Sequence, residues 1–164
     1  MSKLREAFEK GEFAITAEMA PPKGTDLSHL AECAKLVIGR VHAANVTDNQ
    51  SAVMRTSSLA TCKMFEALGL EPVIQMTGRD RNRIAIESEM LSAGFFGIDN
   101  LLALTGDHVC VGDHKQAKPV FDLDAVSILS TATMMNNGTD STGLELKGKT
   151  DLFLGACVTP EYDP

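Results

Sequence analysis

The sequence predicts an α/β protein of the (β/α)8 barrel type, and its 164 residues hold only about the first five β/α units. Three observations lead to this fold class. Short apolar runs alternate with segments of helical periodicity, the runs are apolar on both faces, and polar residues follow the ends of successive runs. Strands that are apolar on both faces form a parallel sheet covered by helices. The alternation alone fits an open, doubly wound sheet equally well.

The predicted elements alternate along the whole chain. A short helix over 2–10 precedes a first strand at 13–19, which ends before Pro21 and Pro22. Glycine follows three of the predicted helices, because a helix often ends on a left-handed residue. Further strands are expected at 41–47, 72–76, 100–105 and 152–158, and further helices at 27–38, 56–68, 81–91 and 122–134.

The polar residues at the strand ends favour the barrel over the open sheet. In a barrel the carboxyl ends of all strands meet at one face, where the active sites of barrel enzymes lie. In an open sheet they spread along an edge, and only the point where the strand order reverses forms a site. The residues in question are Glu18, Thr47, Asp48, Thr77, Asp80 and Asp107.

The composition argues against several classes of partner. The net charge is −7, the pI is about 5.0, and Lys and Arg are scattered, so neither nucleic acid nor an anionic membrane surface is expected as a partner. The sequence contains no apolar segment of membrane-spanning length and no signal-peptide pattern. Four widely spaced cysteines without a Cys-x-x-Cys pair indicate reduced thiols in a cytoplasmic protein: Cys33, Cys62, Cys110 and Cys157.

Glu18 is the most informative single residue. It interrupts the apolar run Phe13-Ala-Ile-Thr-Ala-Glu-Met-Ala at the inner end of the first predicted strand. Apolar surroundings desolvate a carboxylate and favour its protonated form, which suits a proton donor near neutral pH. The alternative is a structural carboxylate paired with a Lys or Arg, and the sequence alone favours neither reading.

Asp107 closes the fourth predicted strand and therefore faces the same mouth as Glu18. The preceding residue, Gly106, permits a sharp turn or a close approach of the backbone to a ligand. The alternative reading is that Asp107 caps a short turn, which aspartate commonly does.

Two other polar segments are predicted to form neither a metal site nor a phosphate site. Residues 108–114 follow the pattern His-x-Cys-x-x-Asp-His, which matches no standard zinc site, so no metal is expected. The loop contains no phosphate-binding glycine motif either. Arg79, Arg81 and Arg83 are expected to be solvated residues at the start of a helix rather than phosphate ligands.

Together these segments resemble the methylenetetrahydrofolate reductase family. The matches occur in family order along the whole chain. Ala17–Pro22 is similar to the family's Glu-Phe-Phe-Pro-Pro, and Gln75-Met76-Thr77 is similar to the family's third strand end. Leu102–Asp107 is similar to Leu-Arg-Gly-Asp and Pro160–Pro164 to Pro-Glu-x-His-Pro, and the match Lys118-Pro119 lies between these two. Three departures stand out. Met19-Ala20 replaces an aromatic pair, Asp163 replaces a histidine, and the family's barrel is close to twice this length.

The resemblance implies a barrel that holds FAD, or FMN, at the strand carboxyl ends. It implies hydride transfer from reduced flavin to 5,10-methylenetetrahydrofolate, which yields 5-methyltetrahydrofolate. Glu18 would be the general acid that protonates an amine of the folate's five-membered ring and opens it to an iminium, and Asp107 would stabilise that cation. The implied flavin contacts are Thr77, Asn100, Gly106, Asp107, Phe121 and Cys157.

Residues 1–164 are accordingly expected to be the N-terminal part of a flavin-dependent reductase barrel whose remainder is absent. Expected partners are the folate substrate, NAD(P)H or an electron-transfer protein as donor, and further subunits in a homo-oligomer or complex. One alternative is a non-catalytic flavin- or pterin-binding fragment that needs a partner chain, and another is a structural fragment without activity.

Overall fold

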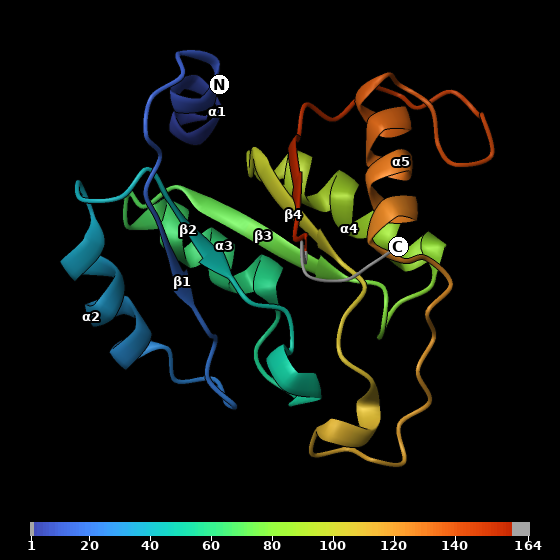
Figure 1. Ribbon diagram of the computed structural model, residues 1–164, viewed down its shortest axis with the longest axis horizontal. Helices are drawn as coiled ribbons and strands as arrows, with labels where there is room; N and C mark the ends of the chain where they lie inside the picture. The colour runs from blue at the N-terminus through green and yellow to red at the C-terminus, as the bar shows by residue number, and fades with distance from the viewer. Residues whose placement is uncertain (1, 159–164) are drawn as a thin grey trace.

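The computed structural model describes residues 2–158 and contains a five-stranded parallel sheet (Figure 1). Its strands are β1 (Thr16–Met19), β2 (Ala43–Val46), β3 (Pro72–Thr77), β4 (Asn100–Leu104) and β5 (Phe153–Ala156). Each strand pairs with the next along the chain, so that the order is β1-β2-β3-β4-β5. This order contradicts the doubly wound alternative, in which the strand order reverses, and it is compatible with part of a barrel wall.

One helix precedes β1, and a helix lies between each pair of successive strands. They are α1 (Lys3–Glu9), α2 (Ser28–Val37), α3 (Ser58–Ala67), α4 (Arg83–Phe95) and α5 (Ala125–Asn136), with short 3-10 helices η1 (Gln50–Ala52) and η2 (Val109–Val111) after β2 and β4. A side-chain oxygen of the N-cap residue accepts a backbone N–H bond at the start of α1, α3, α4 and α5, from Ser2, Ser57, Asn82 and Asp124 respectively. None of the described helices combines the length and the apolar character needed to cross a membrane.

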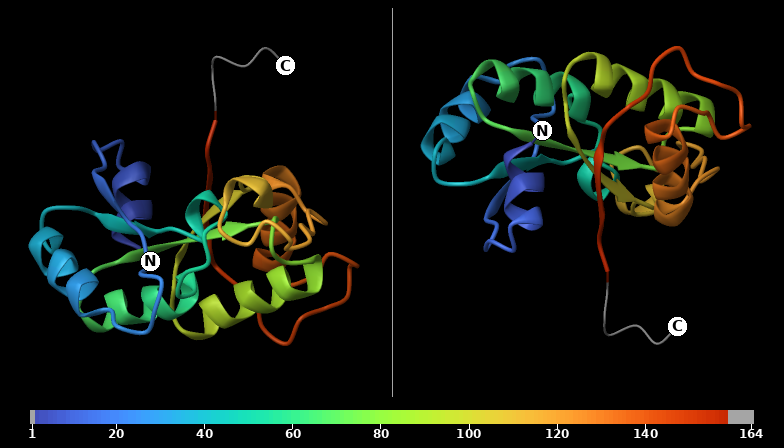
Figure 2. Two further views of the ribbon diagram at one scale, coloured as in Figure 1. Left: turned by 90° about the horizontal axis from the view of Figure 1, so that it is seen from below. Right: turned by 90° about the horizontal axis from the view of Figure 1, so that it is seen from above.

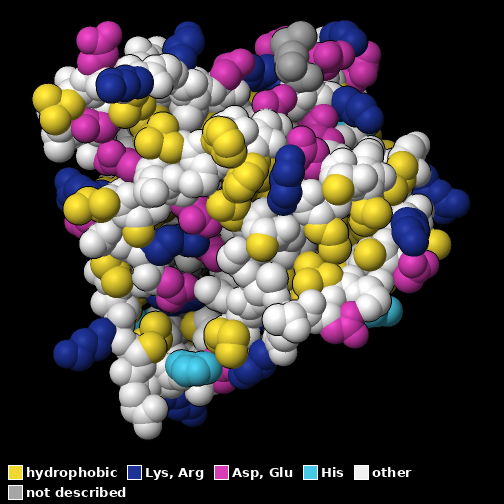
Figure 3. Space-filling model, turned by 180° about the vertical axis from the view of Figure 1, so that it is seen from behind, with side chains coloured by type: hydrophobic (Ala, Val, Ile, Leu, Met, Phe, Trp, Pro, Cys, Tyr) yellow, Lys and Arg dark blue, Asp and Glu magenta, His cyan; other side chains and the backbone are white. Residues whose placement is uncertain are grey.

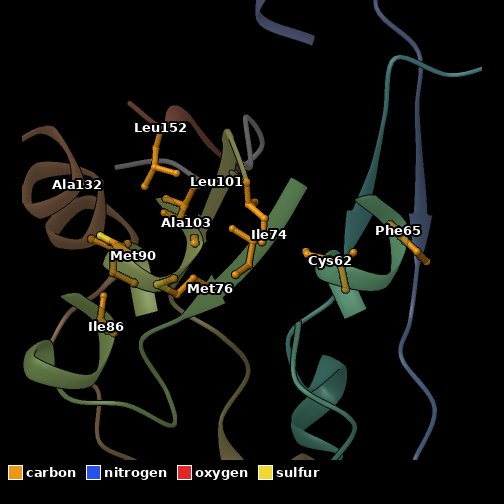
Figure 4. Close-up of a cluster of buried hydrophobic side chains, with 14 of the residues drawn as sticks. Cys62, Phe65, Ile74, Met76, Ile86, Met90, Leu101, Ala103, Ala132 and Leu152 are labelled. Atoms are coloured by element: carbon orange, nitrogen blue, oxygen red, sulfur yellow. The ribbon is translucent and has the colours of Figure 1, made fainter. Parts of the chain in front are cut away.

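The main core lies between the sheet and helices α2 to α5, which pack on the same face of the sheet (Figure 2). Alternate strand side chains point to this face because the side-chain period of a strand is two. Burying a large aliphatic or aromatic side chain contributes roughly 1.5–3 kcal/mol, so this layer dominates the stability of the fold. Figure 4 shows part of it: Cys62 and Phe65 from α3, Ile86 and Met90 from α4, Ala132 from α5, and Ile74, Met76, Leu101 and Ala103 from the strands.

The opposite face of the sheet is only partly covered. Helix α1 packs over the amino ends of the strands, where Leu4 joins Ala43 and Val73 in a small cluster. The ring centroids of Phe8 and Phe153 lie 5.6 Å apart. Glu71 holds the start of α1 by accepting hydrogen bonds from the first two backbone N–H groups of the helix, at 2.7 and 3.1 Å. Among residues 2–158, no α-helix covers the rest of this face, toward the carboxyl ends of the strands.

The first strand is shorter than the predicted 13–19. It begins at Thr16, which pairs with the first residue of β2, Ala43. Phe13 lies before this pairing starts and is 88% exposed, so it does not belong to a buried strand as predicted. The apolar run therefore marks the approach to the strand as well as the strand itself.

The helix-covered side carries exposed hydrophobic side chains among the charged ones (Figure 3). Three of them follow helical spacing along the outer face of α4: Ile84, Leu91 and Phe95 are exposed at i, i+7 and i+11. Leu91 and Phe95 are one helical turn apart, whereas Glu87 and Ser88 separate them from Ile84.

Candidate functional site

A cleft of about 500 Å³ lies at the carboxyl ends of the strands, on the open face of the sheet. It brings together side chains that are far apart in the sequence and come from, or directly follow, each of the five strands. They are Glu18, Thr47, Asp48, Gln50, Ser51, Gln75, Thr77, Arg79, Leu102, Leu104, Gly106, Asp107 and Cys157. Five of the six polar strand-end residues predicted to meet at one mouth line this cleft, whereas Asp80 lines a neighbouring hollow.

Glu18 lies on the open face of β1 and its side chain is exposed. Its carboxylate Oε2 accepts a hydrogen bond of 3.3 Å from Nε2 of Gln75. The predicted burial of Glu18 is wrong for this chain, because β1 is the edge strand and no described element covers its open face at this level. The structural alternative also lacks support, since no Lys or Arg of residues 2–158 forms an ion pair with Glu18.

Asp48 forms the buried anchor of the cleft. One of its oxygens, Oδ2, accepts hydrogen bonds from the backbone N–H of Thr77 at 2.8 Å and from its hydroxyl at 3.0 Å. The guanidinium of Arg81 forms an ion pair with the same oxygen. These contacts tie the loop after β2 to the end of β3, and they fix the side chain of Thr77 at the floor of the cleft.

Arg79 is buried, with 2% of its side chain exposed, and it joins three loops. Its guanidinium donates to the backbone carbonyls of Asn49 at 3.1 Å and Asp107 at 3.3 Å, and it forms a forked pair with Asp80 at 2.9 and 2.7 Å. The hydrogen bond to Asp80 raises the pKa of Arg79 further. Burial alone would raise the pKa of Asp80, but the bond and charge of Arg79 outweigh burial and lower it.

The prediction that the arginines after β3 are solvated is therefore wrong for two of them. Arg79 is buried, and Arg81 is only 18% exposed in its pair with Asp48. Only Arg83 behaves as predicted: it is half exposed and pairs with Asp122 at the surface. Local sequence does not distinguish these three, because their orientation depends on carbonyl and carboxylate groups of other loops.

Asp107 and Gly106 form the wall of the cleft that follows β4. The Asp107 side chain is exposed, and its backbone carbonyl is held by Arg79. Gly106 has a left-handed φ of +91°, and a Cβ added there would lie 3.1 Å from Cβ of Thr77. The left-handed φ and the close packing against Thr77 favour glycine at this position, and the approach of this backbone to a ligand stays a prediction.

Two of the six residues implied as flavin contacts do not line the cleft. Asn100 starts β4, about 13 Å along the strand from its carboxyl end, and its amide donates to Glu71 at 2.9 Å and to the carbonyl of Pro72 at 3.0 Å. Phe121 lies in the loop before α5, where its ring stacks on His108 at 6.3 Å between centroids. Thr77, Gly106, Asp107 and Cys157 do line it.

The loop after β4 packs over the neighbouring loops and forms a second hollow of about 210 Å³ beside Arg79. Asp113 forms an ion pair with Lys23 and hydrogen bonds with His114, at 2.8 Å, and with the backbone N–H of Met54. The His114 bond, followed by the Lys23 bond, holds the pKa of Asp113 well below its usual range. Within residues 2–158, no group of three or more His, Cys, Asp or Glu side chains is arranged to hold a metal ion.

Gln75 is a cleft residue for which the sequence predicted no role, as are Gln50 and Ser51. An amide in the otherwise apolar strand Pro72-Val-Ile-Gln-Met-Thr is the same signal that singled out Glu18, and it lies on the same face as Thr77. The four cysteines are free. The predicted match at Pro160–Pro164 lies outside the described residues.

Comparison with known proteins assigns most of the chain to a family. Residues 3–137 match the family described as methylenetetrahydrofolate reductase, and this range includes every strand end of the cleft except that of β5. A comparison with curated proteins gave no match. The matched range covers most of the chain, so the protein belongs to the methylenetetrahydrofolate reductase family.

Proposed function

We propose that this chain forms the main part of the active-site face of a flavin-dependent enzyme that reduces 5,10-methylenetetrahydrofolate to 5-methyltetrahydrofolate. The observation that carries the proposal is the presence of two carboxylates, Glu18 and Asp107, in one cleft of a chain that belongs to this family. The proposed electron donor is NAD(P)H or an electron-transfer protein. The proposed location is the cytoplasm, which the four free thiols support.

In this proposal Glu18 is the general acid. Its carboxyl group gives a proton to an amine of the folate's five-membered ring, the bond from that nitrogen to the methylene carbon breaks, and the other nitrogen and the methylene carbon form an iminium cation. The ionised carboxylate of Asp107 stabilises this cation electrostatically from the opposite wall of the cleft. The two carboxylates thus have different tasks, one as a proton donor and one as a fixed negative charge.

The cleft fits a flavin ring in size and in lining. A volume of about 500 Å³ falls within the usual range for organic ligands, and Gly106 brings the backbone close to the floor. We propose that Thr77, Gly106, Asp107 and Cys157 hold FAD, or FMN as the alternative, and we leave out Asn100 and Phe121 because neither lines the cleft. When bound, reduced flavin supplies the hydride that converts the methylene carbon to a methyl group.

We further propose that residues 1–164 are the N-terminal part of a (β/α)8 barrel, completed by further β/α units or by another subunit. The open upper face of the sheet and the exposed edge strands β1 and β5 support this, because unpaired strand edges and exposed apolar surface favour association. The exposed apolar side chains on α4 support a further contact between subunits. Residues 1–164 expressed alone should therefore self-associate and lack flavin in analytical ultracentrifugation with an absorbance scan. A yellow monomer that unfolds cooperatively would contradict this proposal.

The function itself is tested by the protein's activity and by the variant Asp107→Asn. The parent protein, with its barrel completed by further β/α units or by another subunit, should bind flavin and reduce methylenetetrahydrofolate with reduced flavin. Asp107→Asn should lower this rate by roughly ten- to a thousandfold, because the cation loses its fixed counter-charge. It should also raise the reduction potential of the bound flavin, since a carboxylate beside the ring opposes the gain of negative charge. Flavin binding without any folate turnover would instead favour the non-catalytic binding protein.

A further inference from the structure

Gln75 makes a long-range contact with the proposed general acid. It lies on the open face of β3 with only 5% of its surface exposed, and its Nε2 donates a hydrogen bond of 3.3 Å to Oε2 of Glu18. Strand β2 lies between their two strands, so the side chains meet across about 10 Å of sheet. The buried residue is therefore the fixed partner, and the exposed Glu18 is the one that is held.

The arginine side chains near the cleft are paired with other groups and form no ion pair with Glu18. Arg79 is engaged with Asp80 and with two backbone carbonyls, and Arg81 is engaged with Asp48. The remaining carboxylate of the cleft, Asp107, carries the same charge as Glu18. Among residues 2–158, the described hydrogen-bond partner of the Glu18 side chain is the neutral amide of Gln75.

A neutral amide differs from a cation in what it permits. A lysine or arginine partner stabilises only the ionised carboxylate and opposes its protonation. A carboxamide offers an N–H donor to the carboxylate and, after rotation of its terminal torsion, a carbonyl acceptor to the protonated carboxyl group. Gln75 is thus able to hold Glu18 in both protonation states that a general acid passes through.

We propose that Gln75 is a positioning residue, which keeps the carboxyl group of Glu18 aimed into the cleft while leaving it free to gain and lose a proton. This inference rests on the proposed function, in which Glu18 is the proton donor. It assigns Gln75 no contact with the reacting atoms.

Two substitutions of similar length separate this role from a purely structural one. Gln75→Met removes the hydrogen bond, and kcat for folate reduction should fall about tenfold while KM for the folate changes less than about twofold. Gln75→Lys keeps a donor but adds a charge that holds Glu18 ionised, so kcat should fall further, by about a hundredfold. If Gln75 served only as a hydrogen-bond donor to ionised Glu18, the Lys variant would be the more active of the two. That order of activities would overturn the proposal.

A matched control is Asn136→Leu. Asn136 is also a partly buried carboxamide, but it bonds to Thr150 and Leu152 at the far end of α5, outside the cleft. Its replacement should leave kcat and KM unchanged in the folded protein. Circular dichroism and flavin content should match between all three variants and the parent.

A readout independent of turnover is the carboxyl ¹³C resonance of Glu18 in the flavin-free protein, assigned by its loss in Glu18→Gln. Gln75→Met should shift this resonance, and Asn136→Leu should leave it in place. An unshifted resonance in Gln75→Met would overturn the proposal whatever the kinetics show. If the resonance shifts but the parent protein has no folate turnover, the contact is established and the proposed function is what fails.

Discussion

Replacing Glu18 by glutamine should reduce turnover of methylenetetrahydrofolate by at least about a hundredfold, because a neutral amide cannot protonate the leaving amine. The substitution is nearly isosteric and keeps a side chain that can bond to Gln75, so it should not disturb the sheet. Flavin binding and reduction of the flavin by the donor should survive, since neither step needs this proton. Steady-state turnover and rapid-reaction measurements of the two half-reactions check these outcomes separately.

The control for this experiment is the same chemical change outside the cleft. Glu32 is an exposed carboxylate on α2 that pairs with Lys35 at the surface, and Glu32→Gln should leave both half-reactions unchanged. If Glu18→Gln turns over within a few-fold of the parent rate, Glu18 is not the general acid and is only a structural carboxylate. Loss of flavin reduction together with folate reduction would point to a damaged cleft instead of a missing proton.

The strand order and the location of the cleft were predictable because they depend on patterns that are local in the sequence. Each apolar run is short, each is followed by a helix, and the polar residue at its end falls at the carboxyl end of the strand. Since parallel strands in consecutive order bring these ends together, Glu18, Thr77 and Asp107 could be assigned to one mouth before their contacts were known.

The errors concern properties that depend on distant partners. Asn100 is an exception, because it begins the predicted strand 100–105 and so already lay at the end of that strand away from the cleft; its assignment as a flavin contact came from the family resemblance. The exposure of Glu18 depends on what covers the edge strand β1. The burial of Arg79 depends on two carbonyl groups, in loops 30 and 28 residues away, that only the folded chain brings to its guanidinium.

Arg79 also leads to the prediction with the largest effect on stability. Arg79→Met should lower the free energy of unfolding by roughly 3–5 kcal/mol, because it leaves two partly buried carbonyl groups and the partly buried Asp80 without their cationic partner. Urea denaturation of the protein that carries this chain measures the loss. The same variant should bind flavin weakly even where it is folded, because the loops after β2, β3 and β4 lose their common tie.

Two control variants test whether the stability loss in Arg79→Met comes from the hydrogen bonds of the Arg79 guanidinium. Arg83→Met removes an arginine four residues away whose pair with Asp122 is exposed, and it should leave the unfolding midpoint nearly unchanged. Arg79→Lys keeps the charge but cannot reach Asn49, Asp80 and Asp107 together, so it should recover only part of the lost stability.

The pH dependence supplies the final check on Arg79. The pKa of Asp80 is lowered in the folded protein, so its stabilising contribution is present above the unfolded pKa of about 3.9 and disappears as the pH falls through the lower folded value. In Arg79→Met this contribution is absent at every pH. The difference in unfolding free energy between parent and variant should therefore be constant near neutrality and narrow as the pH falls into the acid range, because burial without Arg79 raises the pKa of Asp80 in the variant. A difference that stays the same down to pH 2 would mean that the carbonyl bonds to Asn49 and Asp107, and not the pair with Asp80, account for the whole effect.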